Sequence, residues 1–379
     1  MKHTIYDLKQ MQSLPLKQKV ILTETRVSDW FCFYDGEVYV ACSGGKDSTV
    51  LAHICAKVCK KLGYALTLVF VDTGLEYPEI RKFVRQLVEI LKDKYQIIVN
   101  LEILRPKMRF DEVIKKYGYP VIGKRQAEAI SLAKKNLIQK RYSIRLMHLG
   151  VSIDEATKKG LKMPDADVLQ KYISSSKDSK FNMPKYKKIL SCDFNVSALC
   201  CNIMKKSPSY EYQKRTGKKP LLATMAAESA LRESAWLKNG CNAFDAEHPS
   251  STPMSFWTEQ DVLQYIREHD ISIASVYGDV VEAEEFAQMD IFGEGTYKLK
   301  TTGCDRTGCI FCGFGCHLDC TPTRFQRLKE THPKQYEYCI GGGEYDENGL
   351  WIPNKQGLGL GKVFDKLNEI YGQDFIKYK

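Results

Sequence analysis

The fold of this chain is decided by the stretch Val40-Ala41-Cys42-Ser43-Gly44-Gly45-Lys46-Asp47-Ser48-Thr49-Val50. Its first residues are apolar and fit a buried strand, two glycines fit a turn, and apolar residues then recur at helical spacing as far as Val58. The first turn of a helix has unpaired amide groups and carries the positive end of the helix dipole, and glycine lets the main chain approach a ligand closely. The stretch therefore predicts a loop that binds phosphate.

This loop differs from the common ATPase loop G-x-x-x-x-G-K-[ST], because only two residues separate Gly44 from Asp47. We expect Asp47 to face solvent and to hold Mg²⁺ against a polyphosphate, since carboxylate oxygens are ligands that this ion prefers. The residues expected to hold phosphate oxygens are Ser43, Gly44, Gly45, Lys46 and Ser48.

A second apolar run, residues 66–71, ends in Asp72-Thr73-Gly74-Leu75-Glu76-Tyr77-Pro78-Glu79. Open α/β sheets bind ligands at the carboxyl ends of their strands, so both motifs are expected at one site. The strings Ser-Gly-Gly-Lys-Asp-Ser and Asp-Thr-Gly-x-Glu-x-Pro resemble signatures of the N-type ATP pyrophosphatases, in particular the phosphoadenylyl-sulfate (PAPS) reductase-like branch. The resemblance implies that Asp72, Thr73 and Gly74 lie beside the nucleoside of a bound adenine nucleotide.

Two further blocks extend this resemblance. Glu228-Ser229-Ala230-Leu231-Arg232 resembles the Glu-Ser-x-x-Arg element that closes over the nucleotide phosphates in these enzymes. Relatives usually have an arginine where this chain has Met225, so one phosphate contact is either missing or supplied by another residue. The alternative is a helix in which Glu228 and Arg232 pair at i,i+4. The block from Pro253 to Val262 also resembles the family, and Thr258 is predicted to cap the next helix, with Asp261 at its third position.

We therefore predict an α/β fold: a Rossmann-like parallel sheet of the adenine nucleotide alpha hydrolase type, flanked by helices, with a mostly helical or irregular cysteine-rich C-terminal region. Strands are predicted at 37–43, 65–72 and 97–104, and helices at 47–62, 78–94, 110–117 and 122–148. The predicted parts are a helical lead-in at 1–34, a nucleotide-binding domain at 35–270 with a basic polar insertion at about 151–190, and a metal or iron–sulfur region with the C-terminal tail at 271–379.

Composition narrows the class of protein. A chain of 379 residues, 44% of them apolar, is long enough for one large or two modest cores. The first residues lack the apolar core of a signal peptide, and no apolar run approaches the ~20 residues that cross a bilayer, so we expect a cytoplasmic protein with no membrane partner. In that reducing compartment, 14 cysteines favour metal or catalytic use over disulfides.

The net charge of +10 is concentrated in the middle of the chain. From Arg105 to Arg145 there are twelve Lys or Arg against three Asp or Glu, and a second basic region extends from Lys158 to Lys219. Such a field favours a nucleic acid or another polyanion as a partner. The alternative is a solvated, lysine-rich helical surface.

Five cysteines fall between Cys304 and Cys320, and Cys309-x-x-Cys312 places two thiols on one turn. The adjacent pair Cys200-Cys201 lies far upstream. Four thiolates can bind one zinc ion or a cubane cluster. The set resembles the ligands of the 4Fe-4S adenylyl-sulfate (APS) reductases and of DndC-type sulfurtransferases, which implies one 4Fe-4S cluster on Cys200, Cys201, Cys309 and Cys312. Zinc and metal-free buried thiols remain alternatives, and possible substitute ligands are Cys304, Cys316 and Cys320.

The resemblance implies an activity: ATP-dependent sulfur transfer to a nucleic acid, either DNA or tRNA, or to a small metabolite. An acceptor oxygen attacks the α-phosphate of ATP, and sulfur then displaces AMP. Asp47, Lys46 and Arg232 are the expected catalytic residues, and Glu228 and Ser229 belong to the expected nucleotide site. The implied cofactors are Mg²⁺ and the cluster. The sulfur donor would be a cysteine desulfurase or similar protein, or a thiol reductant.

Two other functions remain open. An assimilatory APS or PAPS reductase uses APS or PAPS as its substrate, but its Glu-Cys-Gly-[Ile/Leu]-His tail is absent, and the last cysteine is Cys339. Cys316 would then have to act as its nucleophile. A non-catalytic nucleic-acid-binding module is the third possibility, and the intact glycine loop with Asp47 argues against it.

Overall fold

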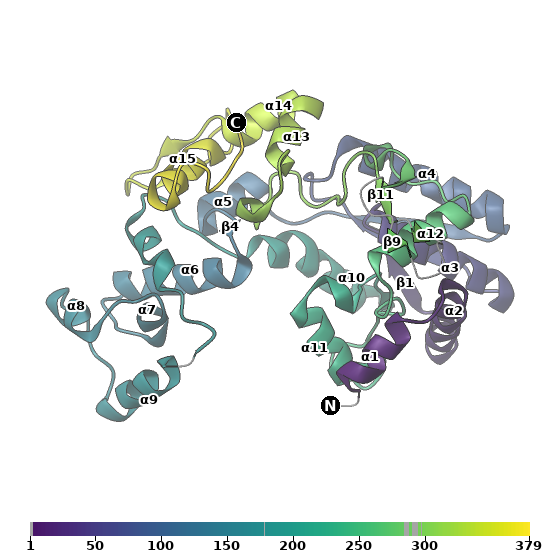
Figure 1. Cartoon of the computed structure of the whole chain (residues 1–379), viewed down its shortest axis with the longest axis horizontal. Helices are drawn as coiled ribbons and strands as arrows, with labels where there is room; N and C mark the ends of the chain where they lie inside the picture. Colours follow the sequence, from purple (N-terminus) through teal and green to yellow (C-terminus); the bar gives the residue numbers. More distant parts are fainter. Residues whose placement is uncertain (1–2, 178, 284–287, 290–294, 297) are drawn as a thin grey trace. The chain divides into compact units, whose positions relative to one another are not determined.

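The computed structural model describes residues 3–177, 179–283, 288–289, 295–296 and 298–379 (Figure 1). The chain forms two compact units. Unit 1 consists of Met1–Pro106 and Lys206–Cys309, and unit 2 of Lys107–Lys205 and Ile310–Lys379. These boundaries differ from the predicted ones near residues 35 and 271, because each unit is assembled from two separate stretches of chain.

The helices of unit 1 are α1 (Ile5–Gln12), α2 (Leu16–Phe33), α3 (Lys46–Leu62), α4 (Pro78–Tyr95), α10 (Ser207–Thr216), η3 (Ala226–Glu228), α11 (Ala230–Asn239), α12 (Glu259–Glu268) and η4 (Ser275–Tyr277). Its strands are β1 (Val38–Ala41), β2 (Leu66–Val71), β3 (Val99–Leu104), β5 (Lys219–Leu221), β6 (Asn242–Ala243), β7 (Ser250–Ser251), β8 (Val280–Glu282), β9 (Gln288–Met289), β10 (Gly295–Thr296) and β11 (Leu299–Thr301).

The central sheet of unit 1 has the strand order β3-β2-β1-β5-β7-β6. Its neighbouring strands pair in parallel, except that β6 is antiparallel to β7. Helix α3 packs on β1 and β2, and α4 packs on β3. The predicted α/β fold with a mostly parallel sheet is therefore confirmed.

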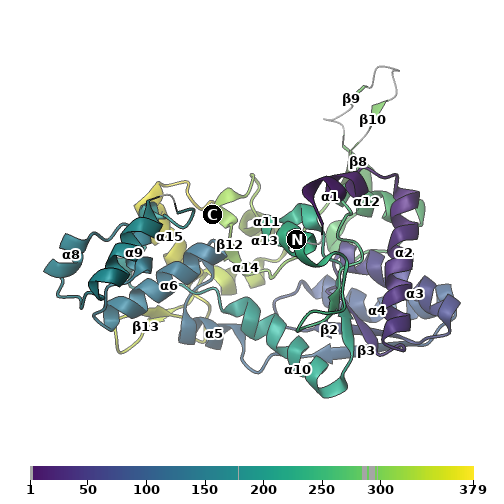
Figure 2. The same cartoon turned by 90° about the horizontal axis from the view of Figure 1, so that it is seen from below.

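The sheet is covered on both faces. Side chains alternate along a strand, so Tyr39 and its neighbours Val38 and Val40 point to opposite faces. Tyr39 packs with Val69 and with Tyr212 of α10, and the two tyrosine rings meet edge to face with centroids 5.3 Å apart. Helix α10 also contacts β3 (Figure 2). The opposite face carries the valines against α3, so β1 is buried on both sides and its apolar sequence is explained.

The predicted cap of α12 is present and extends into the core. Thr258 Oγ1 accepts the Asp261 amide at 3.3 Å, and Asp261 accepts the Thr258 amide at 2.7 Å. Asp261 also pairs with the buried ammonium of Lys19 at 2.7 Å, which ties α12 to α2. One carboxylate therefore satisfies both a helix end and a buried cation.

Asp261→Ala is expected to lower the free energy of unfolding by about 3 kcal/mol or more, because Lys19 would be left buried without a counter-charge. Thr258→Ala removes the capping hydroxyl and its hydrogen bond to Asp261 but keeps the pair of Asp261 with Lys19. It is the matched control and should cost about 1 kcal/mol. Urea denaturation followed by circular dichroism measures both. Equal losses for the two variants would contradict a role for Asp261 beyond the cap.

The helices of unit 2 are α5 (Phe110–Tyr117), α6 (Lys124–Ile138), α7 (Ile144–His148), α8 (Ile153–Lys158), α9 (Ala166–Ser176), η1 (Pro184–Ser191), η6 (Cys316–Leu318), α13 (Arg324–Thr331), α14 (Pro333–Ile340) and α15 (Leu360–Tyr371). The segment η2 (Asn202–Lys206) ends at the boundary with unit 1. The strands form two pairs: β4 (Val121–Ile122) with β12 (Gly313–Phe314), and β13 (Glu344–Tyr345) with β14 (Trp351–Ile352).

Unit 2 departs from the prediction in two places. The single helix expected at 122–148 is broken between α6 and α7, where Lys140 adopts a left-handed φ of 50° and the Tyr142 amide donates to the Lys162 carbonyl at 2.9 Å. The expected polar loop at 151–190 contains α8, α9 and η1, and buried residues such as Ala156 and Ile189 hold it to the rest of the unit. In the part of the chain that the structure describes, no helix is long and apolar enough to cross a membrane.

Candidate functional site

The phosphate loop lies where the strand order of unit 1 reverses. From β1 the chain proceeds to β2 and β3 on one side, whereas β5 and β7 lie on the other side. In open α/β sheets the carboxyl ends of the two strands at such a reversal form the ligand crevice. The predicted loop at Ser43–Ser48 follows β1, and the predicted Glu228–Arg232 block follows β5. The topology thus brings both motifs to one edge of the sheet.

The loop keeps its shape through its own hydrogen bonds. The Ser43 amide donates to Ser48 Oγ at 3.2 Å, and the Gly45 amide donates to Ser43 Oγ at 3.3 Å. The Ser48 hydroxyl donates to the Gly45 carbonyl at 3.0 Å. Gly44 has a φ of +73°, and a Cβ there would lie 2.7 Å from Ile80 Cγ2. Only glycine fits this position, so the sequence enforces the turn that ends in α3.

Asp47 lies in the first turn of α3 and is half-buried, which corrects the prediction of a solvent-facing loop carboxylate. Its Oδ1 is buried and has no hydrogen-bond partner among the described residues. Burial raises the pKa of this carboxyl, and the Lys46 ammonium opposes the shift. A buried carboxylate oxygen without a partner is costly in free energy, and a bound cation would remove that cost.

Lys46 is held by protein groups. Its side chain is buried, and Nζ lies 2.9 Å from Glu259 Oε1 and donates to the Asp305 carbonyl at 2.6 Å. The sequence did not indicate Glu259 as a partner, since it lies 213 residues downstream on α12. A phosphate oxygen that binds Lys46 would therefore either share its ammonium with Glu259 or replace Glu259 as its partner.

Arg232 and Arg306 flank the carboxylate of Glu228. Arg232 pairs with Glu228 at i,i+4, so the alternative ion pair is formed, and Arg306 Nη1 lies 3.7 Å from Glu228 Oε1. Both arginines also act to lower the pKa of Asp47, which places their charges around the loop. Met225 is buried, with 3% of its surface exposed, at the position where relatives have arginine. Arg306 supplies the second arginine beside this element. It lies in the cysteine-rich segment, and the sequence did not indicate that it reaches the phosphate loop.

Tyr277 and Thr307 lie over the start of α3. The Lys46 amide donates to the Tyr277 hydroxyl at 3.2 Å, and this hydroxyl is 2.6 Å from Thr307 Oγ1. A Cβ at Gly45 would lie 3.2 Å from the same hydroxyl. The two hydroxyls thus lie at the N-terminal, positive end of the α3 dipole, where the sequence predicts phosphate.

The predicted motif from Asp72 to Glu79 forms a turn that hydrogen bonds and an ion pair stabilise. Asp72 is buried, pairs with Arg81 Nη2 at 2.8 Å and accepts the Gly74 amide at 3.2 Å. The Thr73 amide and hydroxyl donate to the Glu76 carboxylate at 3.0 and 2.7 Å. Asp72, Thr73 and Gly74 are therefore positioned by neighbours within the motif, which explains why it needs Glu76.

The predicted metal cysteines lie in both units. Cys200, Cys201 and Cys312 belong to unit 2, whereas Cys309 is the last residue of unit 1. A hydrogen bond from Cys200 lowers the pKa of Cys201 and outweighs the effect of burial, with further help from the Lys124 ammonium. Cys201 and Cys312 also interact electrostatically. Among the described residues, no three His, Cys, Asp or Glu side chains form a ready-made metal site.

The substitute cysteines differ in their surroundings. Cys316 is 2% exposed, and burial raises its pKa to about 12. Cys339 is fully buried, and burial raises its pKa well above the ordinary value. Cys304 is half-buried and Cys320 is exposed. Thiols as buried as Cys316 and Cys339 stay protonated at neutral pH and are poor nucleophiles.

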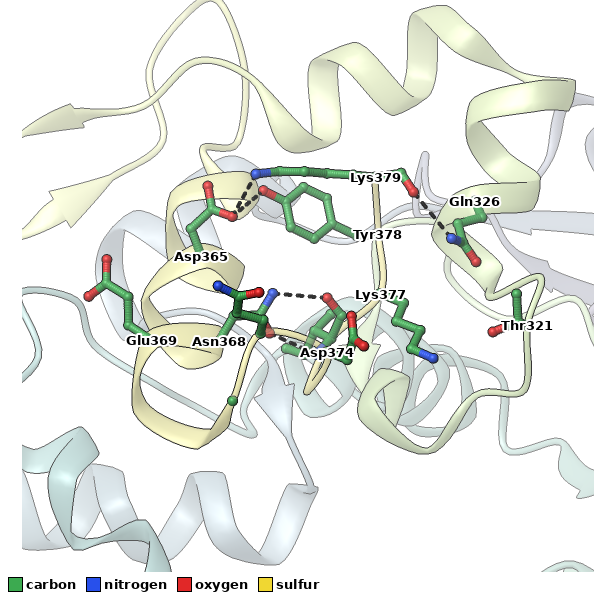
Figure 3. A pocket seen from close by; sticks show the side chains of 12 residues that line it. Thr321, Gln326, Asp365, Asn368, Glu369, Asp374, Lys377, Tyr378 and Lys379 are labelled. Atoms are coloured by element: carbon green, nitrogen blue, oxygen red, sulfur yellow. Dashed lines mark hydrogen bonds and ion pairs between the residues drawn. The ribbon is translucent and has the colours of Figure 1, made fainter.

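A polar pocket of about 930 Å³ lies beside α15 in unit 2 (Figure 3). Asp365 accepts the Tyr378 hydroxyl at 2.7 Å and pairs with Lys379 at 3.0 Å, and the Gln326 amide donates to the Lys379 carbonyl at 3.1 Å. None of the predicted site residues lines this pocket. Its polar groups mainly tie down the last residues of the chain.

A smaller pocket of about 210 Å³ includes Arg232. Its other walls are mainly apolar and come from α11 and the β6–β7 hairpin, with Leu231, Ala235 and Trp236 among them. A space of this kind beside a cation suits an apolar, ring-sized group attached to an anion.

Comparison with known proteins agrees with this geometry. Residues 37–159 match the phosphoadenosine phosphosulfate reductase domain, a segment that includes the phosphate loop and the Asp72 turn. The comparison with curated proteins found no matching relative. Members of this family are generally enzymes that use nucleotides in sulfur chemistry. Over residues 37–159, this chain is therefore similar to the PAPS reductase-like family.

Proposed function

We propose that this chain is an ATP-dependent sulfurtransferase that adenylylates its acceptor. An oxygen of the acceptor would form a bond to the α-phosphorus of ATP while the bond from that phosphorus to the bridging oxygen breaks, releasing pyrophosphate. A sulfur nucleophile at the oxidation level of sulfide would then displace AMP, which leaves with the acceptor oxygen. If the donor is a persulfide from a cysteine desulfurase, a thiol reductant must supply two electrons.

The observation that carries this proposal is the unpartnered Oδ1 of Asp47 at the start of α3, surrounded by cations. Lys46, Arg232 and Arg306 contribute three positive charges, and Asp47, Glu228 and Glu259 contribute three negative ones. The oxygens of a bound polyphosphate would pair with these three cations in place of the carboxylates. Phosphoryl-transfer sites act chiefly by positioning substrate and neutralising charge, and these residues can do both.

The donor set also fits a magnesium ion. Asp47 would hold Mg²⁺ through its buried carboxylate oxygen. When bound, the ion would polarise the phosphates and stabilise the charge that develops on pyrophosphate. The pocket beside Arg232 would receive the adenine ring or an apolar part of the acceptor.

The cysteines bear on two questions: which metal group the protein holds, and whether it transfers sulfur or reduces APS or PAPS. Cys201 has a lowered pKa, whereas burial raises the pKa of Cys312, and the two cysteines interact electrostatically in unit 2. Sulfur ligands of this kind suit soft metals. With Cys200 and Cys309 they would hold a 4Fe-4S cluster, or zinc as the alternative, and the cluster would carry or deliver sulfur. The reductase alternative needs a reactive thiol, and the burial of Cys316 and Cys339 argues against both as that nucleophile.

Product analysis tests the proposal. Anaerobically purified protein would be incubated with Mg-ATP and sulfide, with tRNA, DNA or no acceptor, and in parallel with APS or PAPS and a thiol. AMP and pyrophosphate in equal amounts, formed only from ATP, would support the sulfurtransferase. Sulfite from APS or PAPS would establish the reductase instead, and the absence of any product would favour a non-catalytic protein.

Arg306→Ala is expected to weaken Mg-ATP binding about tenfold, because one charge-assisted contact to the phosphates would be lost. Arg306→Lys should recover part of the loss, since it keeps the charge but not the two-pronged geometry. Isothermal titration measures the affinities. Arg267→Ala is the control, because Arg267 pairs with Glu282 on another part of unit 1. Equal affinities for Arg306→Ala and the wild type would remove Arg306 from the site.

A further inference from the structure

Three cations of unit 2 surround one aromatic ring. The Arg125 guanidinium lies 5.1 Å from the ring centroid of Phe181, and Arg145 and Lys180 each lie 6.0 Å from it. Arg125 comes from α6, Arg145 from α7, and Lys180 from the segment after α9. Folding therefore gathers charges that are separated in the sequence onto one ring.

These charges have no carboxylate partner among the residues that the structure describes. The carboxylate of Glu155, on α8, is already paired with Lys159 and Lys187. Arg125 and Lys180 are exposed, and Arg145 and Phe181 are half-buried. Like charges gathered without counter-charges repel each other, so an anion bound there would stabilise the arrangement.

Contacts with α7 hold the Phe181 ring in place. The Met183 amide donates to the His148 carbonyl at 2.7 Å, and Met183 is buried, so the segment that carries Phe181 is fixed to α7. The His148 ring stacks on Phe181 with centroids 6.2 Å apart and an angle of 23° between the planes. Only 4% of His148 is exposed, and neither ring nitrogen has a partner in the described part of unit 2. Burial, with help from the Arg145 charge, lowers the pKa of His148. The His148 imidazole is therefore neutral at neutral pH and packs against Phe181 without adding a charge.

We propose that Arg125, Arg145, Lys180 and Phe181 form a binding site for single-stranded nucleic acid, in which the ring stacks on one base and the cations hold the flanking phosphates. A base can stack on a protein ring only when it is not stacked within a duplex. The cations would attract the phosphate backbone of the nucleic acid. The Phe181 ring would give the preference for single strands. The inference rests on the proposed function only in identifying the bound strand as the sulfur acceptor.

Fluorescence anisotropy with labelled 20-nucleotide DNA, RNA and duplex DNA, across a salt series, tests the site. Phe181→Leu keeps an apolar side chain without the ring and should weaken single-strand binding about tenfold. Arg125→Gln and Arg145→Gln should each lower the slope of log K against log salt by about 0.7. Tighter binding of DNA or of RNA identifies which strand the site takes.

Matched controls exist in both units. Phe33→Leu removes a ring that is 64% exposed in unit 1, and Lys115→Gln removes an exposed lysine of α5 in unit 2. Neither should change the affinity for single strands by more than about twofold. Mg-ATP affinity, measured on the same variants, should stay at the wild-type value, so failure of this site is distinguishable from failure of the nucleotide site. Unchanged single-strand binding by Phe181→Leu and both arginine variants, or equal binding of duplex and single strands, would overturn the proposal.

Discussion

Asp47→Ala is expected to reduce magnesium-dependent ATP turnover by a factor of about 100 or more, the usual loss when a group that neutralises charge at a reacting centre is removed. The carboxylate oxygen Oδ1 is buried and unpartnered among the described residues, so its removal should not cost hydrogen bonds. We therefore expect the variant to remain folded. Release of pyrophosphate measures turnover, and isothermal titration measures Mg-ATP binding.

Stability provides a second readout for the same variant. Burial raises the folded-state pKa of Asp47 above the ordinary value of 3.8, so the folded protein binds a proton more tightly than the unfolded chain does. As the pH rises above 3.8, the buried charge lowers the free energy of unfolding, and Asp47→Ala removes this penalty. At neutral pH the variant should be no less stable than the wild type, and only the wild type should gain stability from Mg²⁺.

Asp29→Ala is the control, because Asp29 is a half-exposed carboxylate that pairs with Arg26 on the surface of α2. It should leave turnover, affinity and the response to Mg²⁺ unchanged. Wild-type turnover and unchanged Mg-ATP affinity in Asp47→Ala would show that the loop has been assigned wrongly.

The first half of unit 1 could be predicted from the sequence because its signals are local. The predicted strand at 65–72 and helix at 78–94 appear as β2 and α4, within about two residues at each end. In both cases the apolar period and the flanking Gly or Pro residues specify the element without help from distant parts of the chain. The same is true of the glycine loop, whose turn depends on Gly44 itself.

Other features depend on contacts that no local pattern encodes. Arg306 and Tyr277 reach the start of α3 from segments more than 200 residues downstream, and neither was predicted at the phosphate loop. The division into two units follows from β5 pairing beside β1, which requires the chain to leave the first unit at residue 106 and return at 206. The two units therefore cannot be read from position along the sequence alone. The break between α6 and α7 was missed for a similar reason, since Tyr142 bonds to Lys162 across a loop.

The surroundings of Asp47 differ from those that the sequence predicted. The loop pattern identified its carboxylate, but the exposure of a side chain depends on what packs over it, and the segment containing Arg306 was not expected there. The buried and unpartnered oxygen makes a cation site more specific than a solvent-facing carboxylate would. The error in placement thus strengthens the chemical argument for this residue.

Cys201→Ala is expected to remove most of the metal and visible absorption from anaerobically purified protein. Cys200, Cys201, Cys309 and Cys312 are the proposed ligands, and a 4Fe-4S cluster bound by thiolates gives broad visible absorption and about four irons per chain. The lowered pKa of Cys201 keeps its thiolate populated at neutral pH, which is the form that binds metal. Loss of one ligand should also lower stability, since metal binding is coupled to folding.

Two cysteines outside the proposed set serve as controls. Cys32 is exposed, so Cys32→Ala should change neither the stability nor the metal content. Cys339 is buried, so Cys339→Ala should lower stability through a small cavity but leave the iron content intact. The second control separates a loss of metal caused by a weakened fold from a loss caused by a missing ligand. Ultraviolet–visible spectra with iron and zinc analysis of all three variants provide the comparison.

One outcome would contradict the iron–sulfur proposal. It is a colourless protein with about one zinc ion, unaffected by Cys201→Ala but lost in variants of the local group, which consists of Cys304, Cys309, Cys312 and either Cys316 or Cys320. Zinc on these local C-terminal cysteines would then be the better description, because their close spacing suits a four-thiolate zinc site.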